Sequence, residues 1–234
     1  MKIAMTDPLD ALIVAHGQPS DPDPAEAALA ALAVRVQSRM DGAAVGSATL
    51  AAPGTLEAAL DRLAPDGAIY PFFMADGIFV RKTLPARLGG HPARVLAPLG
   101  RDPNLPALAA RHLEEERVAR GWPAEEVALL IAAHGSARGP SAAAAARDFG
   151  AALDALWPGL APVFGFVEQA PFLAEAARAQ PARTLCLPFF AAEGGHYRED
   201  VPEALEAARF AGALLPPLGQ HPGVPELIAR ALGG

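Results

Sequence analysis

The sequence contains a single cysteine, no long hydrophobic run and no signal-like segment at its start, although 52% of its 234 residues are hydrophobic. The one cysteine, Cys186, excludes an internal disulfide framework. No apolar run approaches the roughly 20 residues that a membrane-spanning helix requires. The first seven residues lack the apolar core of a signal peptide. We therefore expect a cytoplasmic protein with no membrane partner.

Basic residues are outnumbered by acidic ones, 19 against 26, which gives a formal net charge of -7 and a pI near 5.3. A nucleic-acid partner requires a basic face, so this balance argues against one. The hydrophobic fraction is large enough for a substantial core. The length suits one large domain or two of ordinary size, and a repeat within the sequence favours two.

The repeat begins with two short apolar strands that both end in His-Gly, residues 11–17 and 128–135, whose histidines stand 118 positions apart at 16 and 134. Further landmarks recur in the same order at spacings of 117 to 119. They are Pro53 and Pro171, Glu57 and Glu175, residues 70–73 and 187–190, Gly77 and Gly194, Pro85 and Pro202, and residues 98–100 and 217–219. Matches in this order and at these spacings indicate a duplicated domain.

Each copy alternates strand-like apolar runs with helical stretches, which predicts a parallel sheet covered on both faces. The predicted strands are 9–15, 44–50, 68–73 and 93–97 in the first copy, and 127–133, 162–167, 184–190 and 211–215 in the second. The predicted helices are 24–40, 55–63, 105–120, 141–156 and 202–210. We thus expect an α/β protein of two similar domains, each a four-stranded parallel sheet flanked by helices.

The boundary between the copies is predicted near Gly121, where the charged helix 105–120 ends before Pro123. This places an N-terminal domain at residues 1–121 and a C-terminal domain at residues 122–234. Because no low-complexity linker separates the copies, we expect a closely paired arrangement with a cleft between them.

The stretch 187–202 combines the end of a buried strand, a glycine loop that carries His196, and a helix start at Asp200-Val201-Pro202. In open α/β sheets, ligands bind beyond the carboxyl ends of the strands. Asp200 is followed by proline and then by a glutamate, which is typical of a helix N-cap. The stretch therefore predicts an imidazole at a ligand-binding edge, with Asp200 as the cap.

The repeat provides an internal control on which polar groups matter. A histidine occurs in both copies, as His16 and His134. At a spacing of 117, the residue of the first copy that corresponds to His196 is Phe79. At a spacing of 118, the residue that corresponds to Glu168 is Leu50. In both pairs only the residue of the second copy is polar.

Only the second copy thus holds two histidines and a glutamate at three predicted strand ends. Such strand ends meet at one edge of a parallel sheet, so these side chains are expected to converge. Two imidazoles and a carboxylate suit a borderline divalent metal such as Co(II), Fe(II), Ni(II) or Zn(II).

Other interpretations stay open for single residues. His134 can simply bond its neighbours at a strand-helix turn, and Glu168 can be a solvated loop acid. Thr83, opposite Asp200 in the first copy, is another good N-cap residue, which favours a helix cap at Asp200 and leaves it either a structural residue or one that supports the site residues from behind. The remaining histidines are expected to be surface residues; they are His91, His112 and His221.

Four stretches of the second copy, read together with the duplication, carry a family resemblance. They are the strand-His-Gly-Ser start 130–136, the strand end 166–168 with Pro171, the segment 188–196 from Pro-Phe-Phe to Gly-Gly-His, and Asp200-Val201-Pro202. The combination resembles the CbiX/SirB-type sirohydrochlorin chelatases of the class II chelatase superfamily, which also includes ferrochelatase and the anaerobic cobaltochelatase CbiK. The resemblance covers nearly the whole chain as two tandem copies.

The resemblance implies a lyase that inserts Co(II) or Fe(II) into sirohydrochlorin for cobalamin or sirohaem synthesis, with Ni(II) as a further possible metal substrate. It also implies that His134, Glu168 and His196 handle the metal and take protons from the macrocycle. The divalent metal is then a substrate, no prosthetic group is expected, and the protein is a monomer or a homodimer. The first copy should be catalytically degenerate, since it also has Gln18 where Ser136 stands in the second.

Two rival functions stay open at this stage. The first is a non-catalytic tetrapyrrole or metal carrier of the same fold, and the second is a hydrolase that uses the same three residues around zinc. A metal-dependent change in the sirohydrochlorin spectrum would separate a chelatase from a carrier, and no nucleophile or substrate-pocket signature supports the hydrolase.

Sirohydrochlorin carries many carboxylates, so an acidic protein needs local positive charge to bind it. The residues expected to contact the tetrapyrrole are Ser136, Arg138 and Arg198 in the second copy and Phe79 in the first. Further candidates are Arg147 near the site, Arg81 and Lys82 in the first copy, and Leu50 as part of an apolar wall.

Overall fold

The computed structural model describes residues 8–136 and 139–233. Within this part, contacts group the chain into two compact units. The first unit contains the residues up to Leu99 together with those from Pro222 onward, and the second runs from Gly100 to His221.

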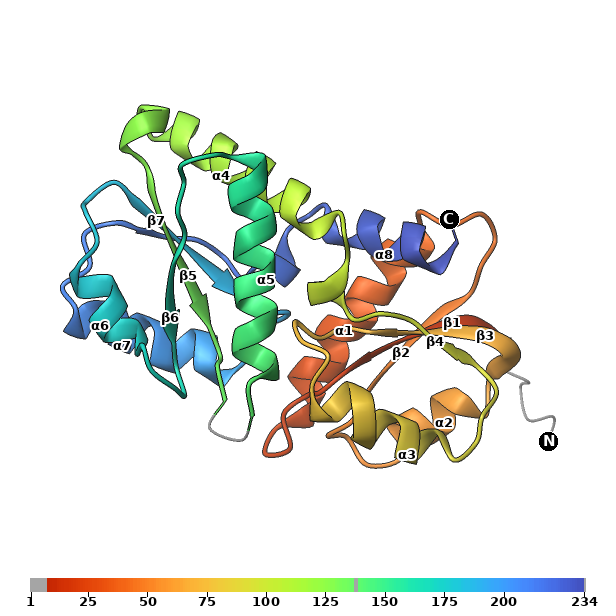
Figure 1. The fold of residues 1–234 in the computed structure, drawn as a ribbon. Coiled ribbons are helices and arrows are strands. Elements are labelled where there is room, and N and C mark those ends of the chain that lie inside the picture. The colour runs from red at the N-terminus through yellow and green to blue at the C-terminus, as the bar shows by residue number, and fades with distance from the viewer. Residues whose placement is uncertain (1–7, 137–138, 234) are drawn as a thin grey trace. The chain divides into compact units, whose positions relative to one another are not determined.

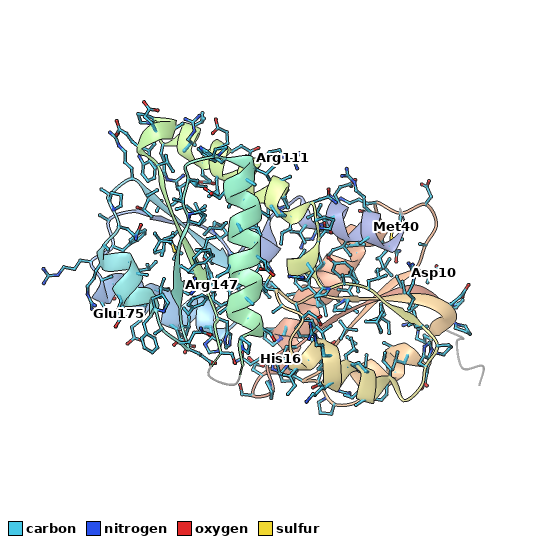
Figure 2. The ribbon with its side chains drawn as sticks, viewed as in Figure 1. Asp10, His16, Met40, Arg111, Arg147 and Glu175 are labelled. Carbon is cyan, nitrogen blue, oxygen red and sulfur yellow. The ribbon has the colours of Figure 1, made fainter. Side chains whose placement is uncertain are left out.

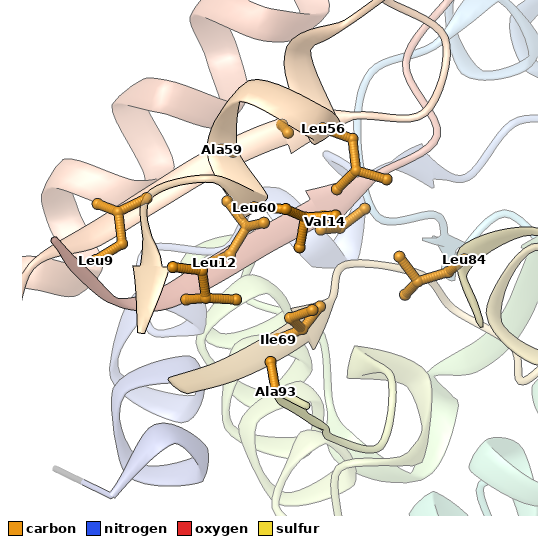
Figure 3. Close-up of a cluster of buried hydrophobic side chains, with 11 residues drawn as sticks. Leu9, Leu12, Val14, Leu56, Ala59, Leu60, Ile69, Leu84 and Ala93 are labelled. Atoms are coloured by element: carbon orange, nitrogen blue, oxygen red, sulfur yellow. The ribbon is translucent and has the colours of Figure 1, made fainter. Parts of the chain in front are cut away.

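The first unit is built on a parallel sheet of strand order β2-β1-β3-β4 (Figure 1). Its strands are β1 (Leu9–Ala15), β2 (Val45–Thr49), β3 (Leu63–Pro71) and β4 (Arg94–Val95), and its helices are α1 (Pro22–Gln37), α2 (Thr55–Leu60), α3 (Leu84–Leu88) and α8 (Val224–Leu232). Alternate strand residues point to opposite faces, so Leu12, Val14 and Ile69 pack against leucines of α2 and α3 (Figure 3). Helix α1 packs against β1 and β2, and α8 packs against α1 and β3.

The second unit repeats this architecture with a parallel sheet of order β6-β5-β7-β8. Its strands are β5 (Ala128–Ala133), β6 (Val163–Phe166), β7 (Thr184–Phe189) and β8 (Ala213–Leu214), and its helices are α4 (Leu105–Ala119), α5 (Ser141–Leu156), α6 (Leu173–Arg178) and α7 (Val201–Ala207). Leu130 and Ala132 face α6 and α7, whereas Phe189 packs against Phe149 of α5, with ring centroids 4.7 Å apart. The sheet therefore has helices on both faces.

The duplication and the α/β fold class predicted from the sequence are confirmed, because both sheets are parallel and share one strand order. The first strand and the helix 141–156 occur with the predicted bounds. The edge strands β4 and β8 are only two residues long, shorter than their apolar runs suggested. The cleft between the copies stays a prediction.

The compact units do not follow the order of the sequence copies. Helix α4, which ends the first copy, packs against α5 of the second unit. Helix α8, which ends the second copy, belongs to the first unit. The boundary near Gly121 between the two sequence copies stays a prediction, and each compact unit contains the last helix of the other copy.

Cys186 lies on β7 and is fully buried. Burial raises the pKa of its thiol to about 12, because the thiolate is not solvated there. Cys186 is therefore a neutral core residue at physiological pH and takes no part in metal or nucleophilic chemistry.

No helix in the described part of the chain is long and apolar enough to cross a membrane.

Candidate active site

Three strand ends of the second unit bring the predicted histidines and glutamate to one edge. His134 directly follows β5, and Glu168 lies two residues beyond the end of β6. His196 begins a π-helical turn, His196–Asp200, after β7. Since β5 lies between β6 and β7 and all three strands are parallel, their carboxyl ends meet at the point where ligands bind in such sheets.

The three side chains are close enough to share a metal ion. One ligand atom from each of His134, Glu168 and His196 lies within 4.8 Å of the others. A carboxylate oxygen of Glu168 is 3.6 Å from Nδ1 of His134, and the other is 3.9 Å from Nε2 of His196. The side chains are 40–42% exposed, so a metal ion can reach them from solvent and keep open coordination positions.

Hydrogen bonds orient both imidazoles with Nε2 available. Nδ1 of His134 lies 2.9 Å from the carbonyl oxygen of Gly135, and Nδ1 of His196 lies 2.5 Å from Oδ2 of Asp200. Donation of the Nδ1 proton to these acceptors leaves the Nε2 lone pair free to bind a metal or accept a proton. The hydrogen bond to Asp200 therefore orients the His196 ring and raises its basicity, as carboxylates do for metal-binding histidines.

The prediction that Asp200 caps a helix is wrong. Its side chain makes no capping hydrogen bond, and its backbone is helical. The π-helical turn that begins at His196 continues directly into α7, so the helical stretch starts before Asp200. Residues four apart lie on the same face of a helix, which directs the carboxylate to His196.

Gln169 is a site residue that the sequence did not indicate. Its side-chain oxygen accepts a hydrogen bond of 2.8 Å from the backbone N–H of Ser136. Next to it, the N–H of Glu168 donates to the carbonyl oxygen of His134 at 2.9 Å. Gly135, at φ +69°, has no room for a Cβ, which would lie 2.7 Å from Cγ of Gln169. These contacts join the loops after β5 and β6 and fix the separation of His134 and Glu168.

The first copy keeps the backbone of this site without its polar set. His16, labelled in Figure 2, follows β1 as His134 follows β5. Phe79 begins a π-helical turn, Phe79–Thr83, as His196 does. The His16 and Phe79 rings are 4.1 Å apart, against 4.2 Å for the two histidines of the second copy. Phe79 therefore occupies the place of His196, as the repeat predicted.

The residue opposite Glu168 is Ala51, which corrects the predicted pairing with Leu50. The N–H of Ala51 donates to the carbonyl oxygen of His16 at 2.9 Å, as the N–H of Glu168 does to that of His134. The strand registers agree, because β1 corresponds to β5 at a spacing of 118, whereas β2 corresponds to β6 at a spacing of 117. The loop after β6 is one residue longer before its proline, which explains the error. The first copy still has no carboxylate at this position.

The residues predicted to bind a carboxylated substrate are placed as follows. Arg138 lies outside the described residues. Arg198, two residues after His196, has a 64% exposed side chain that lies 3.5 Å from Glu193. Arg147 of α5, labelled in Figure 2, lies over the rings of Phe164 and Phe166 at 5.3 and 5.4 Å.

In the first unit, Arg81 pairs with Asp76 at 2.8 Å, so its charge is already partly balanced. Substrate contacts by Ser136, Arg198 and Phe79 stay predictions.

Comparisons with known proteins identify the family and the fold of the chain. The family model described as CbiX matches residues 10–116 and again residues 128–233. A solved structure described as CbiX, the terminal enzyme for biosynthesis of siroheme in denitrifying bacteria, has 46% sequence identity. The match covers 95% of this chain and 97% of that chain, with a TM-score of 0.87. A search of curated proteins found no match.

Two more distant structures share the fold. SirB from Bacillus subtilis with Fe3+ is 16% identical, with a TM-score of 0.74 over 96% of this chain and 94% of that chain. A multi-domain protein from Deinococcus radiodurans, described as structurally similar to chelatases, is 24% identical, with a TM-score of 0.73 over 96% of this chain and 54% of that chain.

Proposed function

This chain belongs to the CbiX family, and on this premise we propose that it is a sirohydrochlorin chelatase, a lyase that inserts Co(II) or Fe(II) into the tetrapyrrole. The observation that carries the proposal is the half-exposed set of His134, Glu168 and His196 at one sheet edge. The related CbiX is described as an enzyme of siroheme biosynthesis, which favours Fe(II) as the metal and sirohaem as the product. Insertion of Co(II) would place the enzyme in cobalamin synthesis.

Metal insertion requires an exchange of charge at the centre of the macrocycle. Two pyrrole N–H protons leave as the divalent ion enters, so the site must both release a metal and accept protons. An imidazole with a free Nε2 does either task, depending on which partner approaches. The Glu168 carboxylate lies beside both rings, and its negative charge offsets that of the incoming ion. We assign metal delivery and proton acceptance to these three residues.

An insertion assay tests the proposal. The purified protein is mixed with sirohydrochlorin and Co(II), Fe(II) or Ni(II) in separate reactions, and the absorption spectrum is followed. A chelatase converts many equivalents of tetrapyrrole per chain, faster than the reaction without enzyme. A carrier produces at most a stoichiometric change, so a single equivalent of conversion would reject the proposal in favour of the carrier.

Replacing Asp200 with asparagine should reduce kcat for insertion by about 10- to 100-fold, the range typical of lost partners behind metal-binding histidines. The amide oxygen still accepts the Nδ1 proton of His196, but the negative charge that makes the ring a better base is lost. KM for sirohydrochlorin should change little. Steady-state kinetics measure both constants.

Glu199→Gln is the matched control, because it removes an adjacent exposed carboxylate. Equal effects of the two variants would mean that Asp200 acts only through net charge and does not position His196.

A further inference from the structure

A second group of metal-binding side chains lies in the same unit and shares no residue with the candidate active site. It consists of His112 on α4, Glu115 on α4, and His221 directly after the 3-10 turn η5 (Leu218–Gln220). One ligand atom from each lies within 4.8 Å of the others. The two imidazole rings meet edge to face, with centroids 4.8 Å apart. This donor set has the composition of the active-site set.

The fold holds these three groups together firmly. His112 and Glu115 are three residues apart on a 15-residue helix, so they share one face. The N–H of His221 donates to the carbonyl oxygen of Leu218 at 3.1 Å, which fixes the backbone after η5. Both histidines are half-buried, and Glu115 is exposed. His112 and Glu115 are therefore held by a regular helix and His221 by a hydrogen-bonded turn, and the site is open to solvent on the Glu115 side.

Glu115 differs from its two neighbours on α4. Glu114 pairs with Arg117, and Glu116 pairs with Arg120, each on the same helix. Glu115 forms no ion pair with an arginine or lysine among the described residues. Its carboxylate lies instead with the two imidazoles. The negative charge of Glu115 is thus available to a cation that the histidines also bind.

The sequence repeat contains this group only once. At the spacing of 119 that relates the ends of the two copies, Ala231 stands opposite His112 and Asp102 stands opposite His221. The shared fold therefore does not require histidine at either position. The active-site set shows the same asymmetry, since the first copy has Phe79 and Ala51 in place of His196 and Glu168.

We propose that His112, Glu115 and His221 form a second binding site for a divalent transition-metal ion, such as Co(II) or Zn(II), which joins α4 to the turn after η5. Two imidazoles and one carboxylate are ligands that such ions prefer, with positions left for water. His112 and His221 stand 109 positions apart in the chain. An ion bound only by the folded arrangement stabilises it in proportion to the logarithm of its free concentration.

The test isolates the second site by removing the first. In a His134→Ala/His196→Phe background, titration calorimetry with Co(II) alone should give one equivalent per chain, with visible absorption bands from nitrogen-ligated cobalt. Adding His112→Ala, which copies Ala231 of the other repeat, should weaken binding at least about 100-fold, since even loss of an outer partner costs 10- to 100-fold. The melting temperature of the background protein should rise with Co(II) concentration and should not rise after His112→Ala.

Glu115→Gln and Glu114→Gln form a matched pair that avoids any effect of the half-buried histidine on folding. Both remove one exposed carboxylate from the same helix turn, but only Glu115→Gln should weaken Co(II) binding. Absence of binding in the background protein, or equal effects of the two glutamine variants, would overturn the proposal. Because the readout is cobalt binding in a protein without the first site, either result leaves the chelatase proposal untouched.

Discussion

Replacing His196 with phenylalanine should reduce metal insertion by at least about 100-fold, because a positioned acid-base group typically contributes 10²- to 10⁴-fold. The variant also removes the Nε2 atom that lies 3.9 Å from Glu168. The fold should tolerate the change, since Phe79 begins the same π-helical turn in the first copy and packs on His16 at 4.1 Å. Steady-state insertion of Co(II) measures the loss.

Binding of sirohydrochlorin should survive in His196→Phe, because the residues proposed to hold its carboxylates are unchanged. A tetrapyrrole titration followed by absorption, together with thermal unfolding, checks this. Tyr197→Phe is the control, because it changes the adjacent residue and removes only a hydroxyl 3.5 Å from the Leu215 carbonyl oxygen. A folded His196→Phe variant that binds tetrapyrrole and inserts metal near the wild-type rate would move the assignment to His134 and Glu168 alone.

Replacing His134 with alanine should remove most of the insertion activity, roughly 100-fold, whereas the same replacement of His16 should leave most of it. The two histidines occupy equivalent positions, because His16 directly follows β1 and His134 directly follows β5, which have the same place in the two sheets. His134 has a carboxylate and a second imidazole beside it, at 3.6 Å and at a ring distance of 4.2 Å. The ring of His16 packs on Phe79, and among the described residues His16 belongs to no group of side chains that could share a metal ion.

The comparison uses kcat and KM of the two alanine variants, measured side by side with Co(II) and with Fe(II). The matched backbone makes each variant the control for the other. Equal losses would show that insertion requires one histidine from each copy, and the proposal of a degenerate first copy would then fail.

The sequence alone determined the duplication, the strand and helix alternation, and the set of polar residues that follow the strands of the second copy. These features depend on local signals, such as apolar runs of strand length that end at glycine or proline. The spacing between copies then showed that His196 and Phe79 correspond, a match that the two π-helical turns bear out. Parallel strands necessarily present their carboxyl ends at one edge, so convergence of His134, Glu168 and His196 followed from topology.

Only the tertiary structure decided how those residues are held. The cap pattern at Asp200 is a local signal that was overridden, because the helical stretch begins at His196 and turns the carboxylate toward the imidazole. The contact of Gln169 with Ser136 joins loops 33 residues apart, and no local pattern records such a pairing.

Contacts between residues far apart in the chain also decide where the last helix of each copy packs, which the sequence did not predict. Helices α4 and α8 pack in the unit of the other copy, and α8 was not among the predicted helices. His112 and His221 were expected to be separate surface residues, and the fold places their rings 4.8 Å apart. Local sequence specifies which elements form, whereas packing between distant elements decides which side chains meet.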